Sequence, residues 1–196
     1  MYEVSDAEQQ KINAATHNIR SAMYELGIIQ SSEETKKTPE RVIKMWMASF
    51  EHIGDEYEDF HLSDNKHAYN QIIHFSNIHY VSWCAHHLLC FSGMAHVLYI
   101  PDKHLVGASK SARIVEWYSK RPQLQENLCH DIINSFVGGV KPLGAMVVLF
   151  GAHDCMRCRG VKQKDSGMTT SAVKGIFADE QDMELKGFKL IELSQR

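Results

Sequence analysis

The chain has 196 residues, of which 44% are hydrophobic and 23% charged, and its formal net charge at pH 7 is −3. This length and composition are typical of one globular domain and exclude a disordered chain. The slightly acidic balance, with a pI near 6.4, gives no overall basic field. We therefore expect no nucleic-acid partner and no binding to anionic membranes.

The N-terminus, MYEVSDAEQQ, has early acidic residues and no apolar segment, which argues against a secretory or transit signal. The longest strongly apolar stretch, residues 145–152, is too short to span a bilayer. We therefore expect a cytoplasmic protein. In that compartment the five cysteines are expected to serve as thiols, metal ligands or catalytic groups rather than as disulfides.

The N-terminal third has helical periodicity. Apolar residues recur at steps of three and four over residues 6–26, which predicts a one-sided helix. A second helix is predicted in TPERVIKMWMASF, with Thr38 as its N-cap and Pro39 at its first position. We group residues 1–68 as an N-terminal helical region and residues 69–196 as the catalytic region of one structural unit.

The rest of the chain predicts strands and helices that do not strictly alternate. Residues 71–101 indicate two strands, with a turn at FSG and a loop that carries a cysteine and paired histidines. SKSARIVEWYSKR and QLQENLCHDIINSFVGG predict two helices, the second ending at Gly138 and Gly139. Residues 144–156 predict a buried strand, and residues 187–194 predict an alternating strand. This order is typical of an α+β fold.

Two clusters of metal-ligating residue types stand far apart in the sequence. Cys84, His86 and His87 lie in SWCAHHLLC, and His153 and Cys155 lie in AHDC. Zinc prefers thiolate and imidazole ligands, and catalytic zinc keeps three protein ligands and one open position. On a strand, His153 and Cys155 would point the same way, so we expect the two clusters to meet on adjacent strands.

Other interpretations of these cysteines and histidines exist. Taken singly, each suits a buried structural role. Cys84, Cys90, Cys155 and Cys158 could form a structural four-thiol site, although the spacing of the first pair is longer than usual. A redox Cys-x-x-Cys is a third interpretation, disfavoured because the motif is expected to end a strand rather than open a helix. The pairing of two clusters favours a catalytic metal site.

Cationic residues suggest an anion site. In GASKSARIV, Ser109 is expected to cap a helix, Lys110 lies in its first turn, and Arg113 follows on the same side. This arrangement suits phosphate, the alternative being a solvated charged face. Glu126 either lies on the surface or accepts two hydrogen bonds from a guanine-like edge. Arg159 places positive charge beside the second cluster, which suits a polyphosphate.

With these motifs assembled, the chain resembles the GTP cyclohydrolase I family over roughly residues 35–180. The resemblance is carried by TPERVIKMW, CAHHLL, HVLYIP, GASKSARIV, RPQLQE, AHDCMRCRG and TTS...GIF, in that order. It implies a tunnelling fold (T-fold), in which two helices lie on one face of an antiparallel sheet. It further implies that subunits pool their sheets into a barrel, that two five-membered rings stack into a homodecamer, and that active sites lie between subunits.

The resemblance also implies roles for individual residues. The family's Zn²⁺ ligands fall on Cys84, His87 and Cys155, and its catalytic histidines fall on His86 and His153. Its remaining positions bind the substrate GTP. They are Gln125 and Glu126 for guanine, and Ser109, Lys110, Arg113 and Arg159 for the triphosphate.

The implied reaction opens the guanine imidazole ring of GTP hydrolytically, releases formate and rearranges the product to 7,8-dihydroneopterin triphosphate. This is the first step of tetrahydrofolate, pterin or deazaguanine biosynthesis. Zinc would lower the pKa of a water molecule, and a histidine would protonate N7 of the purine.

One position departs from the family pattern. The family usually reads Cys-Glu-His-His, and the second residue here is Ala85. A carboxylate beside the metal site is therefore missing. Two alternatives follow: an altered cyclohydrolase that stops at a ring-opened formamide or takes another purine nucleotide, and a non-catalytic nucleotide-binding assembly.

Overall fold

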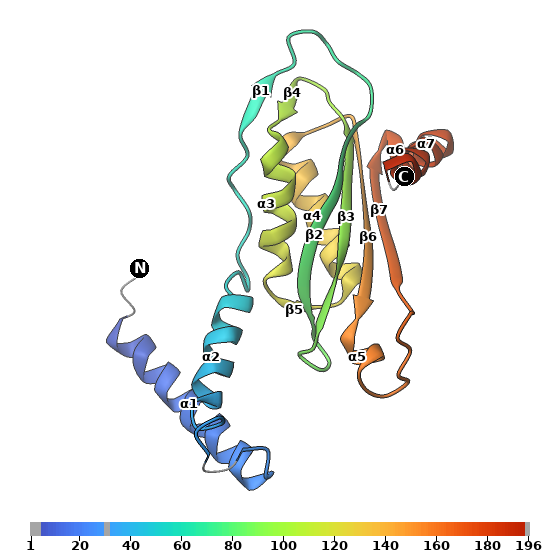
Figure 1. Cartoon of the computed structure of the whole chain (residues 1–196). Coiled ribbons are helices and arrows are strands. Elements are labelled where there is room, and N and C mark those ends of the chain that lie inside the picture. The colour runs from blue at the N-terminus through green and yellow to red at the C-terminus, as the bar shows by residue number, and fades with distance from the viewer. Residues whose placement is uncertain (1–4, 30–31, 195–196) are drawn as a thin grey trace. The chain divides into compact units, whose positions relative to one another are not determined.

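The computed structural model describes residues 5–29 and 32–194, and the chain forms two compact units that divide after residue 51. The first unit is a pair of helices, α1 (Asp6–Glu25) and α2 (Thr38–Ser49) (Figure 1). The second unit contains all the strands and the remaining helices. No helix in these described ranges is both long enough and apolar enough to cross a membrane.

Both predicted N-terminal helices are confirmed, and each begins for a local reason. The Ser5 hydroxyl accepts a hydrogen bond from the Glu8 N–H, and the Glu8 carboxylate accepts one from the Ser5 N–H, which makes a capping box. The second helix starts one residue earlier than predicted, because Lys37 is its N-cap and Thr38 is already helical. Pro39 lies in the first turn of the helix. Backbone N–H groups there have no acceptor within the helix, so the missing N–H of proline costs no hydrogen bond.

The second unit is built around a five-stranded sheet with the order β5-β2-β3-β6-β7. Its long strands pair antiparallel, β5 pairs parallel with β2, and β1 pairs with β4 as a separate ribbon. The mixed α+β class predicted from the sequence is confirmed. The elements are β1 (Leu62–Asp64), β2 (Ile73–Cys84), β3 (Cys90–Ile100), β4 (His104–Val106), α3 (Ala108–Ser119), β5 (Pro122–Gln123), α4 (Gln125–Val140), β6 (Gly144–His153), α5 (Asp154–Arg157), β7 (Met168–Gly175), α6 (Ile176–Asp179) and α7 (Gln181–Ser194).

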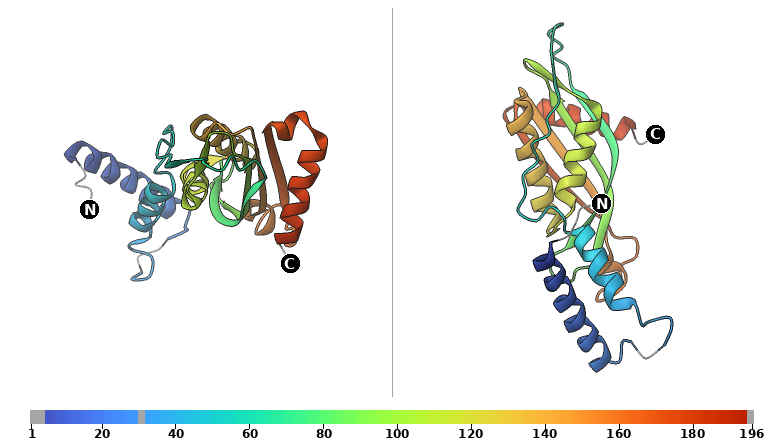
Figure 2. Two further views of the ribbon diagram at one scale, coloured as in Figure 1. Left: turned by 90° about the horizontal axis from the view of Figure 1, so that it is seen from above. Right: turned by 90° about the vertical axis from the view of Figure 1, so that its left-hand side faces the viewer.

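Helices cover both faces of this sheet, as the view from above shows (Figure 2). Alternate residues of β6 point to opposite faces. Val147 packs into the core that includes Ile132 and Phe136 of α4, whereas Met146 packs with Phe177 of α6 on the other face. The prediction of two helices, α3 and α4, on one face is confirmed, and α6 and α7 add a second, smaller core.

The centre of the sheet requires a close approach between β3 and β6. Gly93 is paired with Gly151, and a Cβ atom on Gly93 would lie 1.7 Å from the Phe150 carbonyl oxygen. The predicted turn at FSG is therefore wrong, because these residues lie within β3. The glycine serves the contact between strands rather than a change of chain direction.

Helix α4 also continues beyond its predicted end at Gly138 and Gly139. It runs to Val140, and Lys141 follows in the left-handed conformation with φ 52°. A Cβ atom on Gly139 would lie 2.4 Å from ring atoms of Phe60. This glycine therefore allows the chain before β1 to pack closely on the helix.

The C-terminal segment differs most from the sequence prediction. Residues 187–194 were expected to form a strand, but they form the second half of α7. Gly187 and Ile191, one helical turn apart, are the buried residues of this helix, and Gly187 faces Phe177. An eight-residue stretch is too short to separate this helical spacing from the alternation of a strand. The strand that pairs with β6 is β7 instead.

We expect Gly93→Ala to lower the free energy of unfolding by about 3 kcal/mol or more, because the added methyl group overlaps the β6 backbone. Thermal melting followed by circular dichroism measures this loss. Gly138→Ala is the matched control, since its Cβ atom would have no neighbour within 4 Å and alanine favours a helix. Equal melting temperatures for the two variants would contradict the proposed close approach.

Candidate metal centre

A tight turn after β2 brings Cys84 and His87 together. The Leu88 N–H donates to the Cys84 carbonyl at 2.9 Å, and Leu88 itself has φ 49°. The Cys84 N–H donates to the Leu89 carbonyl across the same turn at 2.9 Å. The distance from the Cys84 Sγ to the His87 Nδ1 is 3.8 Å. The spacing C-x-x-H therefore places one thiol and one imidazole at the end of a strand.

Cys155 reaches the same place from β6. The sequence analysis expected it to continue that strand, but the strand ends at His153 and Cys155 lies in the short helix α5. The two clusters are also not on adjacent strands, because β3 lies between β2 and β6. They meet because β3 pairs with both strands, with Cys90 opposite Trp83 and Phe91 opposite His153.

Cys84, His87 and Cys155 form a group that could hold a metal ion. One ligand atom from each lies within 4.8 Å of the other two, and this is the one such group among the residues described by the structure. Burial and the neighbouring Cys84 thiol raise the pKa of Cys155, so the thiol form is favoured until a cation compensates the charge. Two sulfur atoms and one imidazole nitrogen are a donor set that fits zinc with one open position.

The other two cysteines named in the four-thiol interpretation lie outside this group. Cys158 is exposed, and its thiol donates to the Asp154 carbonyl at 2.9 Å within the turn of α5. Burial raises the pKa of Cys90, with the Asp154 carboxylate adding to the effect. The geometry thus favours the three-ligand arrangement over a four-thiol site.

Both candidate catalytic histidines lie next to this group. The His86 Nδ1 is 3.8 Å from the Cys84 Sγ, and the His86 residue is exposed. His153 stacks on Phe91 with ring centroids 4.7 Å apart and an interplanar angle of 4°. Burial lowers the pKa of His153, although the nearby Glu126 and Asp154 carboxylates act in the opposite direction. A neutral ring at pH 7 is therefore favoured at His153.

Gln125 fixes the orientation of His153. The Gln125 residue is 1% exposed, and its amide nitrogen donates to the carbonyls of Leu149 and Met168 and to the Thr170 hydroxyl at 3.1–3.3 Å. Its carbonyl oxygen is left to accept from the His153 Nε2 at 3.0 Å. The hydrogen of neutral His153 is therefore on Nε2, and Nδ1 is the free acceptor.

Two residues of this arrangement were not found from the sequence. Gly151 makes room for Gln125, because a Cβ atom there would lie 2.4 Å from the Gln125 Oε1. Phe91 supplies the surface on which His153 stacks. A glycine inside an otherwise buried apolar strand was the available signal for a close approach at Gly151.

Glu126 and Arg159 lie at the same end of the sheet as the group of Cys84, His87 and Cys155. Glu126 is in the first turn of α4 and is exposed. The charge of Arg159 acts on Cys155, where it favours the thiolate. Both side chains therefore lie where they could contact a ligand bound at the group of Cys84, His87 and Cys155.

The other expected phosphate contacts lie elsewhere. Helix α3 begins beside β4, and its N-cap is Gly107 rather than the predicted Ser109. Lys110 and Arg113 lie in its first two turns and contact Asp59, whereas the helix ends at Ser119, shortly before β5 pairs with the end of β2. At 1.5 Å per residue the helix separates Lys110 from that end by roughly 14 Å. Figure 1 shows the start of α3 and the end of β2 at opposite ends of the sheet, so one chain does not bring Lys110 and Arg113 to the group of Cys84, His87 and Cys155.

Comparisons with known proteins agree with these observations. The sequence model of the family described as GTP cyclohydrolase I matches residues 15–192. A protein named GTP cyclohydrolase 1 from Caldanaerobacter subterraneus subsp. tengcongensis is 38% identical over 94% of this chain and 97% of its own length. Proteins of the same name from Rickettsia bellii and Streptococcus sanguinis are 39% and 34% identical, over 85% and 94% of this chain and 88% and 98% of their own lengths.

The match extends over both the helical N-terminus and the sheet with its metal group. Such coverage at this identity excludes a likeness limited to one motif. The chain belongs to the GTP cyclohydrolase I family.

Proposed function

We propose that the chain hydrolyses GTP to 7,8-dihydroneopterin triphosphate and formate, as a Zn²⁺-dependent enzyme. The observation that carries this proposal is the group of Cys84, His87 and Cys155, with the oriented imidazole of His153 beside it, in a chain of this family. Cys84, His87 and Cys155 would hold the ion. Bound zinc in such a site supplies an activated water and polarises the atom that the water attacks.

The two histidines would move the protons of ring opening. His153 keeps its hydrogen on Nε2, where Gln125 accepts it, so Nδ1 is free to take a proton. His86 is exposed beside Cys84 and would exchange a proton with the purine nitrogen that becomes basic as the ring opens. We assign Gln125 to orienting His153, since its amide hydrogens are engaged within the chain.

Guanine would be recognised by Glu126. Its carboxylate offers two acceptor oxygens, and the N1–H and 2-amino group of guanine offer two parallel donors. The Glu126 side chain is exposed in the first turn of α4, at the same end of the sheet as His153. This arrangement would hold the purine by the edge opposite to the imidazole ring that reacts.

The triphosphate would be bound by Ser109, Lys110, Arg113 and Arg159. Arg159 lies near Cys155, whereas the first three lie at the far end of α3. That separation supports active sites shared between copies of the chain, with Lys110 and Arg113 supplied by a neighbour. We therefore propose a ring-shaped homo-oligomer, a homodecamer by analogy with the family, whose barrel joins the sheets of successive subunits.

We expect zinc-loaded protein incubated with GTP to release formate and to give a pterin that becomes fluorescent after oxidation. Mass analysis of the products identifies the end point of the reaction. A ring-opened formamide as the final product would contradict the complete reaction and identify an altered cyclohydrolase. Tight GTP binding with no product would contradict catalysis altogether.

We expect Cys155→Ser to lower zinc affinity by more than about a hundredfold and to abolish turnover. Even the loss of a residue that only hydrogen-bonds to a metal ligand lowers metal affinity or activity by about ten- to hundredfold. Metal content after dialysis and formate release are the measurements. Cys158→Ser is the matched control, because this thiol is exposed, lies outside the group of Cys84, His87 and Cys155, and donates to the Asp154 carbonyl. Loss of zinc from Cys158→Ser, or its retention by Cys155→Ser, would contradict the proposed ligand set.

We expect Ala85→Glu to raise the rate of GTP turnover by about tenfold. This is the lower end of the effect on activity of a carboxylate that supports the side chains binding a metal. Ala85 is exposed in the turn between Cys84 and His86, so a longer side chain displaces no buried group. Steady-state kinetics with equal zinc content measure the effect. A lower rate in the variant would show that the site is adapted to the small residue.

A further inference from the structure

Two cations at the start of α3 share one carboxylate of the same chain. The Lys110 Nζ donates to the Asp59 Oδ2 at 2.5 Å, and the Arg113 Nη1 lies 3.4 Å from the same oxygen atom. The side chain of Lys110 is 10% exposed, whereas those of Asp59 and Arg113 are 57% and 59% exposed. The lysine is therefore fixed by its surroundings, and the carboxylate is the partner that can leave.

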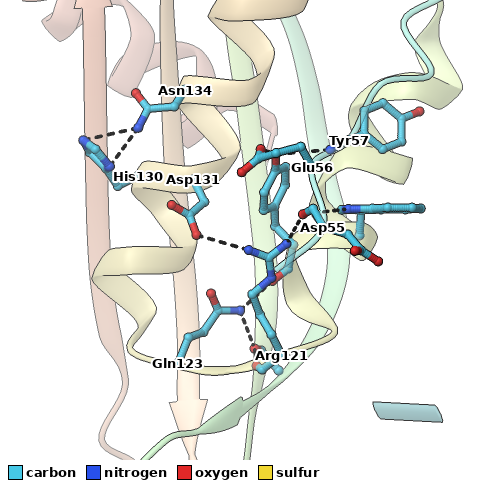
Figure 3. Close-up of polar contacts among 11 residues, drawn as sticks. Asp55, Glu56, Tyr57, Arg121, Gln123, His130, Asp131 and Asn134 are labelled. Atoms are coloured by element: carbon cyan, nitrogen blue, oxygen red, sulfur yellow. Dashed lines mark hydrogen bonds and ion pairs between the residues drawn. The ribbon is translucent and has the colours of Figure 1, made fainter. Parts of the chain in front are cut away.

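The chain presents Asp59 at this place through anchors on both sides. Tyr57 is buried, its N–H donates to the Tyr118 hydroxyl at 3.4 Å, and its own hydroxyl donates to the Asp59 carbonyl at 3.0 Å. Upstream, the Tyr118 hydroxyl donates to Glu56 at 2.5 Å, and Arg121 donates to the Asp55 carbonyl at 2.8 Å (Figure 3). The backbone of this segment is thus held against α3 while the Asp59 carboxylate remains at the surface.

The charges of this cluster do not balance. Lys110 and Arg113 carry two positive charges against the single carboxylate of Asp59, and Lys110 first, then Arg113 and His61, hold the pKa of Asp59 below its usual value. An anion with several oxygens can satisfy both cations better than one carboxylate can. Since the Lys110 stem is buried, an incoming anion would find the ammonium group already in position.

We propose that Asp59 is a positioning residue and an internal competitor of the substrate. Its carboxylate holds the Lys110 and Arg113 side chains in the free protein, and the triphosphate displaces it on binding. The inference rests on the proposed function, in which these two cations bind the triphosphate. It adds a residue outside the proposed contacts that sets the affinity for phosphate without touching the reacting ring.

Asp59→Asn tests this role, because the amide oxygen can still accept from Lys110 but no longer competes as an anion. We expect the dissociation constant of inorganic triphosphate, measured by calorimetry on the full-length protein, to fall by about three- to tenfold, as for a partly exposed charge. The KM for GTP should fall by the same factor with kcat unchanged. Glu58→Gln removes the same charge one residue away and should leave both constants unchanged.

An unchanged or raised dissociation constant in folded Asp59→Asn would overturn the inference, as would an equal gain in Glu58→Gln. Lys110→Met separates this failure from that of the proposed function. If Lys110→Met binds inorganic triphosphate as well as the unsubstituted chain does, the proposed triphosphate contacts are wrong and the inference falls with them. If Lys110→Met loses affinity and Asp59→Asn gains none, only the role of Asp59 is overturned. Calorimetry needs no turnover, so both results hold even for an inactive chain.

Discussion

The pairing of β3 with both β2 and β6 is the constraint on which the candidate site depends. The candidate metal group contains Cys84 from the end of β2 and Cys155 from the short helix after β6, two strands that are not paired with each other in the sheet. Their ends come into register only because β3 bonds to each of them along its length. Gly93 permits this on the β6 side, since any side chain there would meet the opposite backbone. A contact in the middle of the sheet thus sets the geometry at its end.

Beside the candidate metal group, buried hydrogen bonds of Gln125 fix the orientation and the tautomer of His153. Gln125 lies under the sheet edge with its donors satisfied by backbone carbonyls of two strands, β6 and β7, and by a hydroxyl. An unpaired amide at that depth is costly, so the orientation of its carbonyl toward His153 is strongly favoured. Stacking on Phe91 fixes the plane of the same ring. The imidazole is therefore held in both plane and tautomer before any ligand arrives.

Two kinds of feature could be predicted from the sequence: helices whose apolar periodicity extends over several turns, and clusters of residue types that have few uses besides metal binding. The periodicity of α1 and α4 extends over several turns, and paired thiol and imidazole groups have few other uses, so helices and the ligand types could be predicted. Cys155 was assigned to a strand because nothing in AHDC signals a four-residue helix. The apolar residues of 187–194 fit both the alternation of a strand and the four-residue spacing of a helix. The packing of Gly187 against Phe177, which is a tertiary contact, favours the helix. The bond between Gln125 and His153 depends on tertiary register, which no local pattern encodes.

The separation of charged side chains within one chain would give the proposed homo-oligomer a physical reason. Cys84, His87, Cys155 and Glu126 lie at one end of the sheet, while Lys110 lies roughly 14 Å from that end along α3, a rigid helix that cannot fold back on itself. In the isolated chain these cations need a counter-charge, because a buried lysine stem with an unpaired ammonium group is unfavourable. Asp59 supplies it. Under the proposed function, each subunit would offer its neighbour a cation pair already ordered by an internal carboxylate, so that substrate binding exchanges one anion for another rather than organising a disordered site.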